Sequence, residues 1–359
     1  MTYGTYDIGS VNRSQRIVAE LQRPVSLCDY DNVIRKTVIP VLSAILIVCW
    51  RAVSAVGDEA TGIPKEVCVV GDPLISEASG VAVSRTTKDA VWMHNDSGDV
   101  PRLFLVGLNG TTLGIVNVKG VTAMDWEDMC SFELDGESWL LVGDIGDNGR
   151  VRGVTPSPGE RGGISPPVRN GSGRVRSSTP PCQLLLLKEP TLKLTSQADP
   201  NFESTVDVFR TVEFQFPDGP HDCESLAVDT VSRTILLVTK TSPFNSALYS
   251  LPLTLTKGKE SLKAERIASL GVAFATAMDI SSDGRRLAIV NMFSGVMLTR
   301  EDPKKESWAE AGSKPVTVLT LPIRKQGESV CFTADGNSLL LNSEGASQPL
   351  WQTELESRR

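Results

Sequence analysis

The chain has 359 residues, of which 40% are hydrophobic and 22% are charged, so it can form a substantial core and is not disordered as a whole. It carries 43 acidic and 36 basic residues, a formal net charge of -7, which argues against a general nucleic-acid-binding protein. Only two histidines are present, and this limits every mechanism that depends on histidine.

The first 55 residues read as an N-terminal extension followed by a secretory signal peptide. The apolar run VIPVLSAILIVCW at 38–50 is shorter than the roughly 20 residues that span a bilayer. Arg35 and Lys36 precede this run, and Val53 and Ala55 provide small residues for a signal peptidase site. We therefore expect a secreted or periplasmic protein that is not an integral membrane protein.

Two further observations concern this region. Residues 1–32 are polar and lack a clear period, so we expect the natural start of the protein at Val33. A lipid anchor at Cys49 is an alternative to cleavage, although Leu46–Val48 are larger than the residues that such a site prefers. A buried core strand at 38–50 is the other alternative.

Five cysteines follow residue 55, namely Cys68, Cys130, Cys182, Cys223 and Cys331. Their odd number prevents complete pairing, and none of them has CxxC spacing. An oxidising compartment permits a bridge or two, and buried thiols acting as small hydrophobic side chains are the alternative.

From residue 56 onward the sequence consists of short apolar runs of strand length, such as GVAVS, WLLVGD and TILLVTK, without helical periodicity. Asn-Gly and Asp-Gly pairs predict hairpin turns at 109–110, 135–136, 283–284 and 335–336. This pattern is typical of an all-β sandwich, barrel or propeller.

Internal repetition favours the propeller. Five units share a polar or acidic start, an apolar strand, a turn, a second apolar strand and a polar end. They begin at Glu77, Trp126, Cys223, Ala275 and Gly327. We interpret each unit as the inner hairpin of a blade and expect the span 183–216 to supply a sixth. The prediction is a six-bladed β-propeller of four-stranded antiparallel blades, forming one domain over 56–359.

Residues 150–181 interrupt the repeat. They are rich in proline, glycine and serine and contain six arginines and one glutamate, a composition that cannot build a core. We predict a disordered surface loop here. Without this loop and the first 55 residues, 272 residues remain, or about 45 per blade, which is typical of four-stranded blades.

Acidic residues recur at the starts of the predicted inner strands, which line one mouth of the central channel. They are Glu77, Asp125, Glu127, Asp128, Asp222, Glu224 and Glu328, with Thr276 at the matching place of the unit that begins at Ala275. Carboxylates gathered around one axis raise one another's pKa unless a cation neutralises them. Calcium, with about six to eight oxygen ligands, suits such a ring. The alternative is that each acid caps a turn or bonds to the backbone of a neighbouring blade.

A second polar set follows the second strand of the hairpins. It includes HNDSGD at 94–99, DIGDN at 144–148 and Lys240. These stretches predict either metal loops or tight turns closed by Asp and Asn side chains. The candidate metal ligands are Glu77, Asp96, Asp125, Asp144, Asp147 and Glu328. The candidate substrate contacts are Asn95, Asp99, Asn148 and Lys240.

Both histidines, His94 and His221, lie in acid-rich polar ends and not on apolar strand faces. A neighbouring carboxylate would raise the histidine pKa and favour a general acid or a phosphate contact. A transition metal is a further alternative, although the spacing matches no compact zinc motif, and hydrogen bonding within a loop is another. The candidate catalytic residues are Glu127, Glu224, His94 and His221.

Other catalytic and binding motifs are missing from the sequence. It contains no GxSxG elbow, no Walker loop and no dinucleotide fingerprint. The basic insertion lacks interleaved aromatic residues, so we expect no nucleic-acid partner.

The order of EASGVAVS, WMHNDSGD, DWEDM, LLVGDIGDN, ESLAVD and GESVCFTADGNSLLLNSEG resembles secreted bacterial six-bladed, TolB-like propellers. These are related to the propellers called esterase-like phytases and SdiA-regulated proteins. The resemblance covers roughly 70–352 and implies a propeller outside the cytoplasm. It implies that Glu77, Asp125, Glu127, Glu224 and Glu328 are candidate metal or substrate contacts. The blade motifs provide no basic cluster for a highly charged phosphate substrate beyond Lys240 and Arg102.

Two functions remain open at this stage, because a fold does not fix a function. The first is a monomeric envelope protein that binds a small molecule, a glycan or another envelope protein, with calcium at its acidic mouth. The alternative is a calcium-dependent phosphoester or lactone hydrolase with Glu127 or Glu224 as base. A purely structural calcium ion that ties blades together is a third reading.

Overall fold

The computed structural model describes residues 62–153, 179–192, 203–241 and 246–356. All of them belong to the unit Val56–Arg359. The predicted extension and signal peptide at 1–55 lie outside the described residues. No helix within the described ranges is long and apolar enough to cross a membrane.

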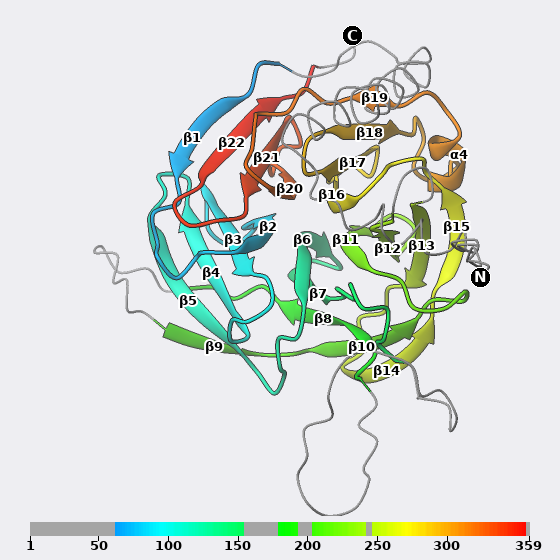
Figure 1. Ribbon diagram of the computed structural model, residues 1–359, viewed down its shortest axis with the longest axis horizontal. Helices are drawn as coiled ribbons and strands as arrows, with labels where there is room; N and C mark the ends of the chain where they lie inside the picture. The colour runs from blue at the N-terminus through cyan, green and yellow to red at the C-terminus, as the bar shows by residue number, and fades with distance from the viewer. Residues whose placement is uncertain (1–61, 154–178, 193–202, 242–245, 357–359) are drawn as a thin grey trace, which may run out of the picture. The chain divides into compact units, whose positions relative to one another are not determined.

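Five sheets are arranged around a common axis as the blades of a propeller (Figure 1). Blade 1 comprises β2 (Ala78–Val83), β3 (Ala90–Asn95), β4 (Arg102–Gly107) and β5 (Thr112–Lys119). Blade 2 comprises β6 (Trp126–Leu134), β7 (Glu137–Asp144), β8 (Cys182–Lys188) and β10 (Arg210–Gln215). Blade 3 comprises β11 (Cys223–Asp229), β12 (Thr234–Thr239), β13 (Ala247–Pro252) and β15 (Glu265–Ser269). Blade 4 comprises β16 (Ala275–Ile280), β17 (Arg286–Asn291), β18 (Gly295–Thr299) and β19 (Thr317–Val318). Blade 5 comprises β20 (Gly327–Phe332), β21 (Ser338–Ser343), β22 (Pro349–Glu354) and β1 (Lys65–Val69).

The prediction of an all-β propeller is confirmed, but the prediction of six blades is wrong. The described residues of the span 183–216 contain no second inner hairpin. Its strands β8 and β10 complete blade 2, and β9 (Glu203–Asp207) adds to the edge of blade 1 by parallel pairing with β5. A second extra strand, β14 (Gly258–Lys263), pairs in parallel with β10. Blades 1 and 2 therefore have five strands each, and these additions supply part of the length that the sequence arithmetic assigned to a sixth blade.

The ring is closed by pairing between the two ends of the described chain. Strand β1 pairs antiparallel with β22, with Lys65 opposite Gln352, so the first described strand completes the last blade. The short helix α4 (Trp308–Gly312), with a capping box formed by Ser307 and Glu310, lies between β18 and β19.

Five apolar clusters make up the core, and each one lies between two neighbouring blades. One joins blades 1 and 2 through residues such as Trp92 and Leu140, and another joins blades 5 and 1 through Cys331 and Val81. The others join blades 2 and 3, 3 and 4, and 4 and 5. Because burial of one large apolar side chain contributes about 1.5–3 kcal/mol, these clusters are the main source of stability between blades.

The predicted hairpin turns are confirmed at all four Asn-Gly and Asp-Gly pairs. Gly110, Gly136, Gly284 and Gly336 have φ values between 70° and 83°, which side chains with a Cβ rarely adopt. At the β6–β7 turn Asp135 also has a positive φ, of 55°, as a two-residue hairpin with both central residues left-handed requires.

The five cysteines after residue 55 are all free thiols in the structure. Four of them are buried, and Cys68 is half-buried. These cysteines therefore act as small hydrophobic side chains, and no disulfide forms among the described residues.

Candidate metal centre

Every inner hairpin carries a one-residue bulge near the start of its inner strand, and the extra residue is polar in each blade. The extra residues are Ser79, Glu127, Glu224, Thr276 and Glu328. A bulge redirects a side chain out of the regular alternation of a strand. None of these five residues is more than 6% exposed. The repeat in the sequence thus brings three glutamates to one level of the axis.

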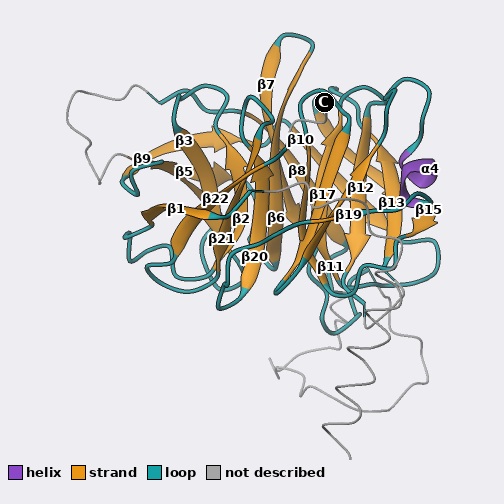
Figure 2. Ribbon diagram, turned by 90° about the horizontal axis from the view of Figure 1, so that it is seen from above, coloured by secondary structure: helices purple, strands orange, loops and turns teal. Residues whose placement is uncertain are grey.

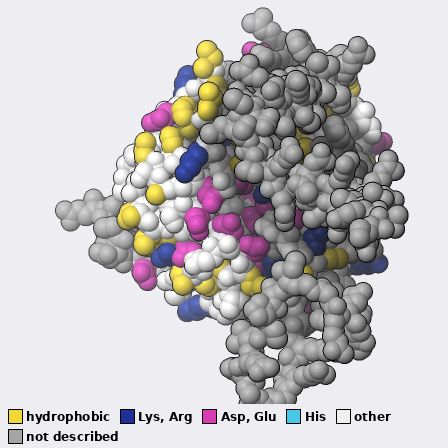
Figure 3. Space-filling view, viewed as in Figure 1, with side chains coloured by type: hydrophobic (Ala, Val, Ile, Leu, Met, Phe, Trp, Pro, Cys, Tyr) yellow, Lys and Arg dark blue, Asp and Glu magenta, His cyan; other side chains and the backbone are white. Residues whose placement is uncertain are grey.

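The inner strands cross the thickness of the ring, so their starts share one face, which we call the mouth face (Figure 2). It consists of the loops that precede β2, β6, β11, β16 and β20 and of the loops between the second and third strands of the blades. Acidic side chains gather near the centre of this face (Figure 3).

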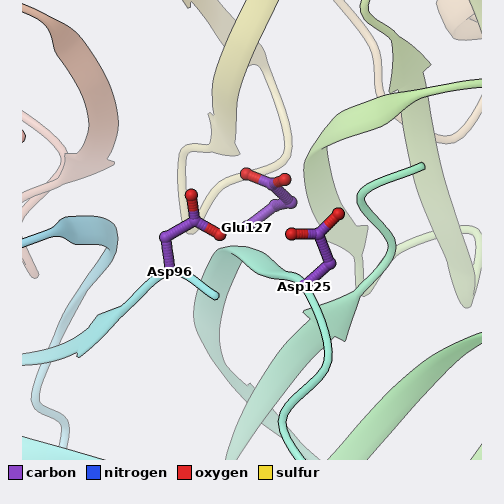
Figure 4. A group of neighbouring side chains, drawn as sticks. All are labelled: Asp96, Asp125 and Glu127. Atoms are coloured by element: carbon purple, nitrogen blue, oxygen red, sulfur yellow. The ribbon is translucent and has the colours of Figure 1, made fainter. Parts of the chain in front are cut away.

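Three carboxylates converge on the mouth face, and we call them the carboxylate triad. Asp96 reaches inward from the segment after β3, and Asp125 and Glu127 flank the first residue of β6 (Figure 4). Each residue offers an oxygen atom, and these oxygens all lie within 4.8 Å of one another. The triad therefore combines ligands from two blades, and an ion bound there would join them.

The backbone around Asp125 is held by the DIGDN stretch after β7. The Asp125 amide donates to Asp144 Oδ1 at 3.1 Å, and its carbonyl accepts from the amides of Ile145 at 3.1 Å and Gly146 at 3.3 Å. These bonds fix the position of Asp125 relative to Glu127.

Gly146 leaves the space between the two carboxylates open. A Cβ atom at this position would lie 2.2 Å from Glu127 Oε1 and 2.5 Å from Asp125 Oδ2, closer than non-bonded Cβ atoms approach in proteins. Only glycine is therefore compatible with this arrangement of the two carboxylates.

The triad is poorly supplied with hydrogen-bond donors. Glu127 is 4% exposed, and its one hydrogen bond within the described residues comes from Ser79 Oγ at 3.5 Å, which is long for such a bond. Burial, followed by the charges of Glu224, Asp96 and Asp125, raises the pKa of Glu127 well above its usual range. Burial and the charge of Asp96 raise the pKa of Asp125 to about 6. Asp96 also has a raised pKa, mainly because of burial.

A cation would remove this electrostatic cost, and the donor set suits a hard one. All three groups are carboxylates, which calcium prefers, and three protein ligands leave several of its about six to eight positions for other oxygen atoms. The residues present therefore fit calcium.

Beside the triad lies a cavity of about 170 Å³, which we call the mouth cavity. It is lined by Ser79, Asp96, Glu127, Asn148, Glu224, Lys240, Gln326, Glu328 and Glu344. Glu224 forms an ion pair with Lys240. Burial raises the pKa of Glu224 to about 8 despite the opposing effect of Lys240, and it raises the pKa of Glu328 to about 7. The cavity therefore contains carboxyl groups that change protonation near neutral pH.

Two of the predicted metal ligands, Asp144 and Asp147, do not face the triad. Asp144 is fully buried, and its oxygens accept from Arg152 Nη1 at 2.8 Å and Gln183 Nε2 at 3.0 Å, in addition to the Asp125 amide. Asp147 accepts from the amides of Val151 at 2.8 Å and Arg152 at 3.0 Å. These two acids hold the loop in shape and leave no oxygen directed at a ligand in the mouth cavity.

The other predicted ligands and contacts divide in the same way. Glu328, Asn148 and Lys240 line the mouth cavity, whereas Glu77 is exposed and lies outside the triad. Asn95 and Asp99 bond to each other at 2.7 Å, and Asp99 forms an ion pair with Arg102, also at 2.7 Å. Asn95, Asp99 and Arg102 therefore stabilise the loop between β3 and β4.

Neither histidine lines the mouth cavity. His94 is fully buried, donates from Nδ1 to the Asn95 carbonyl at 2.9 Å, and packs edge-on against Trp126. Burial lowers the pKa of His94 to about 4, so the ring is neutral at physiological pH. His221 lies 2.9 Å from Asp218 and lines a separate cavity of about 200 Å³. We therefore leave both histidines out of the proposed site.

The predicted insertion is ordered at its two ends. Residues 150–153 and 179–181 are described, whereas the prediction of disorder for 154–178 lies outside the described residues. Arg152 is 7% exposed and donates to Asp144, to the Gly146 carbonyl and to the Pro180 and Pro181 carbonyls. The start of the interruption is thus part of the scaffold of the site.

Sequence reasoning did not single out several residues of the site. Arg152 and Gln326 lie outside the polar motifs, and Gly146 and Ser79 lie within DIGDN and EASGVAVS without being candidate site residues. The position of Ser79 follows from the repeat, since it matches Glu127 and Glu224 in the aligned units. The role of Arg152 depends on a contact that only the folded loop creates.

No family model matches the chain, and no curated protein matches it. Among solved structures, the PQQ-bound aldose sugar dehydrogenase from Streptomyces coelicolor aligns with a TM-score of 0.41 and 13% identity, over 84% of this chain and 100% of that one. The gluconolactonase XC5397 from Xanthomonas campestris aligns with a TM-score of 0.38 and 12% identity, over 84% of this chain and 98% of that one. Matches at this level give no information on what this chain binds.

Proposed function

We propose that this protein is a calcium-dependent binding propeller of the bacterial cell envelope, similar in kind to the TolB-like and esterase-like phytase propellers. Its Ca²⁺ ion would be held by Asp96, Asp125 and Glu127 and would bind an oxygen-bearing small molecule in the mouth cavity. The envelope location is supported by the signal-type sequence at 33–55. We expect the protein to act as a monomer.

The observation that carries the proposal is Glu127. Its carboxylate is 4% exposed, lacks a good hydrogen-bond donor and faces two further carboxylates. An isolated buried charge costs several kcal/mol unless a partner of opposite charge is present. A divalent cation is the partner that all three carboxylates share.

Calcium is favoured over magnesium and zinc by the ligands themselves. Zinc prefers nitrogen and sulfur ligands, and neither described histidine nor any described cysteine belongs to the triad. Magnesium demands near-ideal octahedral geometry, whereas calcium tolerates an irregular set of carboxylates.

Calcium titration of the full chain by calorimetry tests this function. We expect one Ca²⁺ ion per chain, with weaker binding of Mg²⁺, and a loss of affinity of about 100-fold or more in Asp125→Asn, since one charged ligand is removed. Glu77→Gln is the matched control, because Glu77 is an acid of the same face outside the triad. Equal loss in both variants, or an unchanged affinity in Asp125→Asn, would contradict the proposal.

A second candidate function, calcium-dependent hydrolysis, is favoured by Glu224. Burial raises the pKa of this residue to about 8, which is near the value that a general acid or base needs at neutral pH. A calcium ion in the triad would polarise an ester oxygen and activate water. Because the mouth cavity already contains more carboxylates than one divalent cation neutralises, an uncharged ester or lactone fits better than a phosphoester.

The hydrolase is tested with a panel of esters, lactones and phosphoesters in the presence of calcium or a chelator. We expect chelator-sensitive turnover of uncharged esters or lactones that Glu224→Gln abolishes while calcium affinity stays within about threefold. Turnover that persists in Glu224→Gln would rule out Glu224 as the base, and no turnover on any substrate would leave the binding function alone.

A further inference from the structure

Exposed apolar side chains concentrate on the mouth face. Of the ten large apolar side chains exposed among the described residues, seven lie in loops of this face. They are Leu74, Val100, Met124, Val151, Phe274, Phe293 and Ile323. Scattered single apolar residues are normal on a protein surface, so only the ones that lie close together beside the candidate site are informative.

Three of them form what we call the apolar patch, on the loops of blades 4 and 5. Phe274, Phe293 and Ile323 are 46%, 78% and 99% exposed. Phe274 precedes β16, Phe293 lies between β17 and β18, and Ile323 precedes β20.

Asn291 ties the three loops of the apolar patch together. Its Nδ2 donates to the Ala273 carbonyl at 3.0 Å, and its Oδ1 accepts from the Phe293 amide at 2.9 Å. Its backbone carbonyl accepts from Arg324 Nη2 at 3.3 Å. Each loop is therefore anchored beside its exposed apolar residue, so the patch is a preformed surface.

The backbone of Phe274 is strained. Its φ is 53°, which is uncommon for a residue with a bulky side chain. The Phe274 amide donates to the Thr241 carbonyl at 3.2 Å, which holds this conformation. Strain of this kind persists where the surrounding structure enforces it, often at ligand sites.

Two loops of the apolar patch adjoin residues that line the mouth cavity. Thr241, to which Phe274 bonds, directly follows Lys240, and Lys240 lines the cavity. Ile323 is three residues before Gln326, another lining residue. A molecule whose head occupies the cavity would therefore extend over the patch.

Charge limits what the head of this molecule can be. Five carboxylate side chains line the mouth cavity, and Lys240 is the one basic side chain in its lining. With one divalent cation bound, the cavity has no surplus of positive charge to attract an anion. The head that fits offers an uncharged oxygen atom, such as a carbonyl, to the cation.

We propose that the ligand is an uncharged amphiphile, with a carbonyl head of the ester, lactone or amide class on the calcium ion and an alkyl tail on Phe274, Phe293 and Ile323. This inference rests on the proposed calcium site and names the ligand class for it. The mouth cavity, at about 170 Å³, holds the head alone, and the apolar patch contacts the tail.

The test uses γ-lactams with alkyl tails of one to eight carbons, because the amide carbonyl resists hydrolysis. With calcium present, we expect the affinity of the full chain for these lactams to rise about twofold per methylene, roughly half the gain from full burial of a methylene. With a chelator, we expect binding of all tail lengths to weaken at least tenfold.

Phe293→Ser and Ile323→Ser should each flatten the dependence on tail length while calcium affinity stays unchanged. Val231→Ser is the matched control, since Val231 is 40% exposed in the β11–β12 turn at the opposite face. Equal affinity for short and long tails, or a tail dependence that both patch variants retain, would overturn the amphiphile even if calcium binds. Phe293-dependent binding to neutral phosphatidylcholine vesicles without binding of the lactams would also overturn it, in favour of a membrane contact.

Discussion

Glu127 and Asp128 are adjacent in the sequence, are both buried, and have opposite surroundings. Glu127 faces the mouth cavity, and the side-chain hydrogen bond that it accepts from the described part of the chain is a long one from Ser79. Asp128 accepts from the amides of Met129 at 2.9 Å, Leu226 at 2.9 Å and Met278 at 3.1 Å. A carboxylate supplied with donors is part of the scaffold, whereas a carboxylate without donors is available for a ligand.

The same contrast separates the two levels of the channel. Below the mouth, Asp279 accepts from the amides of Ile280 at 2.9 Å and Phe332 at 2.8 Å, and so connects blade 4 to blade 5. Asp128 connects blade 2 to blades 3 and 4. The lower level therefore holds the ring together. The carboxylates of the upper level, Asp125 and Glu127, lack the hydrogen-bond donors that would stabilise their negative charge.

Asp128→Ala should give the largest effect. It leaves three backbone amides of three blades without an acceptor, so we expect the free energy of unfolding to fall by roughly 3–5 kcal/mol. Urea denaturation measures this change. Glu137→Ala, which removes an exposed ion pair with Lys188, should cost less than about 0.5 kcal/mol.

Asp128→Asn keeps one acceptor oxygen and serves if the alanine variant does not fold. Its free energy of unfolding should lie between those of the wild type and Asp128→Ala. A loss below about 1 kcal/mol in Asp128→Ala would show that the lower level does not connect the blades.

The stability of the calcium-free protein should fall as pH rises from about 4 to 8. Burial raises the pKa of Asp125 to about 6, of Glu328 to about 7 and of Glu224 to about 8, all above their values in an unfolded chain. In this window the folded state binds more protons than the unfolded state, so each unit of pH lowers the free energy of unfolding.

We expect a combined fall of at least several kcal/mol across this window, measured by urea denaturation at several pH values with a chelator present. Calcium should reverse the trend, because it binds the deprotonated carboxylates and its affinity rises with pH. A calcium-free stability that increases between pH 5 and 8 would contradict the account of the upper level.

Glu127→Gln should separate stability from calcium binding. Replacing a buried charge that lacks a partner by a neutral side chain of the same shape should raise calcium-free stability at pH 8 by about 1–2 kcal/mol. The stabilisation by calcium, about 2.7 kcal/mol at 100 times the dissociation constant, should disappear. Thermal unfolding with and without calcium measures both effects, and a variant that is destabilised yet still responds to calcium would refute the contrast with Asp128.

The parts of this molecule that follow from the sequence are those that repeat. The alternation of apolar strands and turns predicts the propeller, and the matching positions of Glu127, Glu224 and Glu328 predict their convergence. The number of blades does not follow, because β9 and β14 add to blades 1 and 2 without a sequence unit of their own.

The surroundings of a side chain also cannot be predicted from the sequence. His94 and Asp144 lie in the same kind of polar stretch as Asp96, yet the first is enclosed in the core and the second is held by Arg152 and Gln183. Whether an acid has donors depends on backbone amides from other blades, as the contacts of Asp128 with Leu226 and Met278 illustrate. A residue type and its spacing indicate which groups meet but not which of them remain free.

Arg152→Met should produce the smallest effect, because Arg152 acts on the triad only through the scaffold residue Asp144. Arg152 holds Asp144 at 2.8 Å, and Asp144 in turn holds the Asp125 amide at 3.1 Å, so Arg152 is a positioning residue for the triad. Loss of such an indirect contact to a metal ligand weakens metal binding by about tenfold or more. Calcium titration of the full chain measures this loss, with Arg233→Met as the matched control, because Arg233 pairs with Asp135 in the β6–β7 turn at the opposite face.

The pH dependence distinguishes positioning from a general loss of structure. The charge of Arg152 lowers the pKa of Asp125 against the larger effect of burial, so its removal should raise that pKa and shift the pH of half-maximal calcium binding upward. Arg152→Lys keeps the charge but not the planar group that reaches Asp144 and the Gly146 carbonyl together, so it should restore the pH profile more fully than the affinity. If Arg152→Met lowers stability without moving either quantity, Arg152 supports only the loop, and Asp125 is positioned by the amides of Ile145 and Gly146 alone.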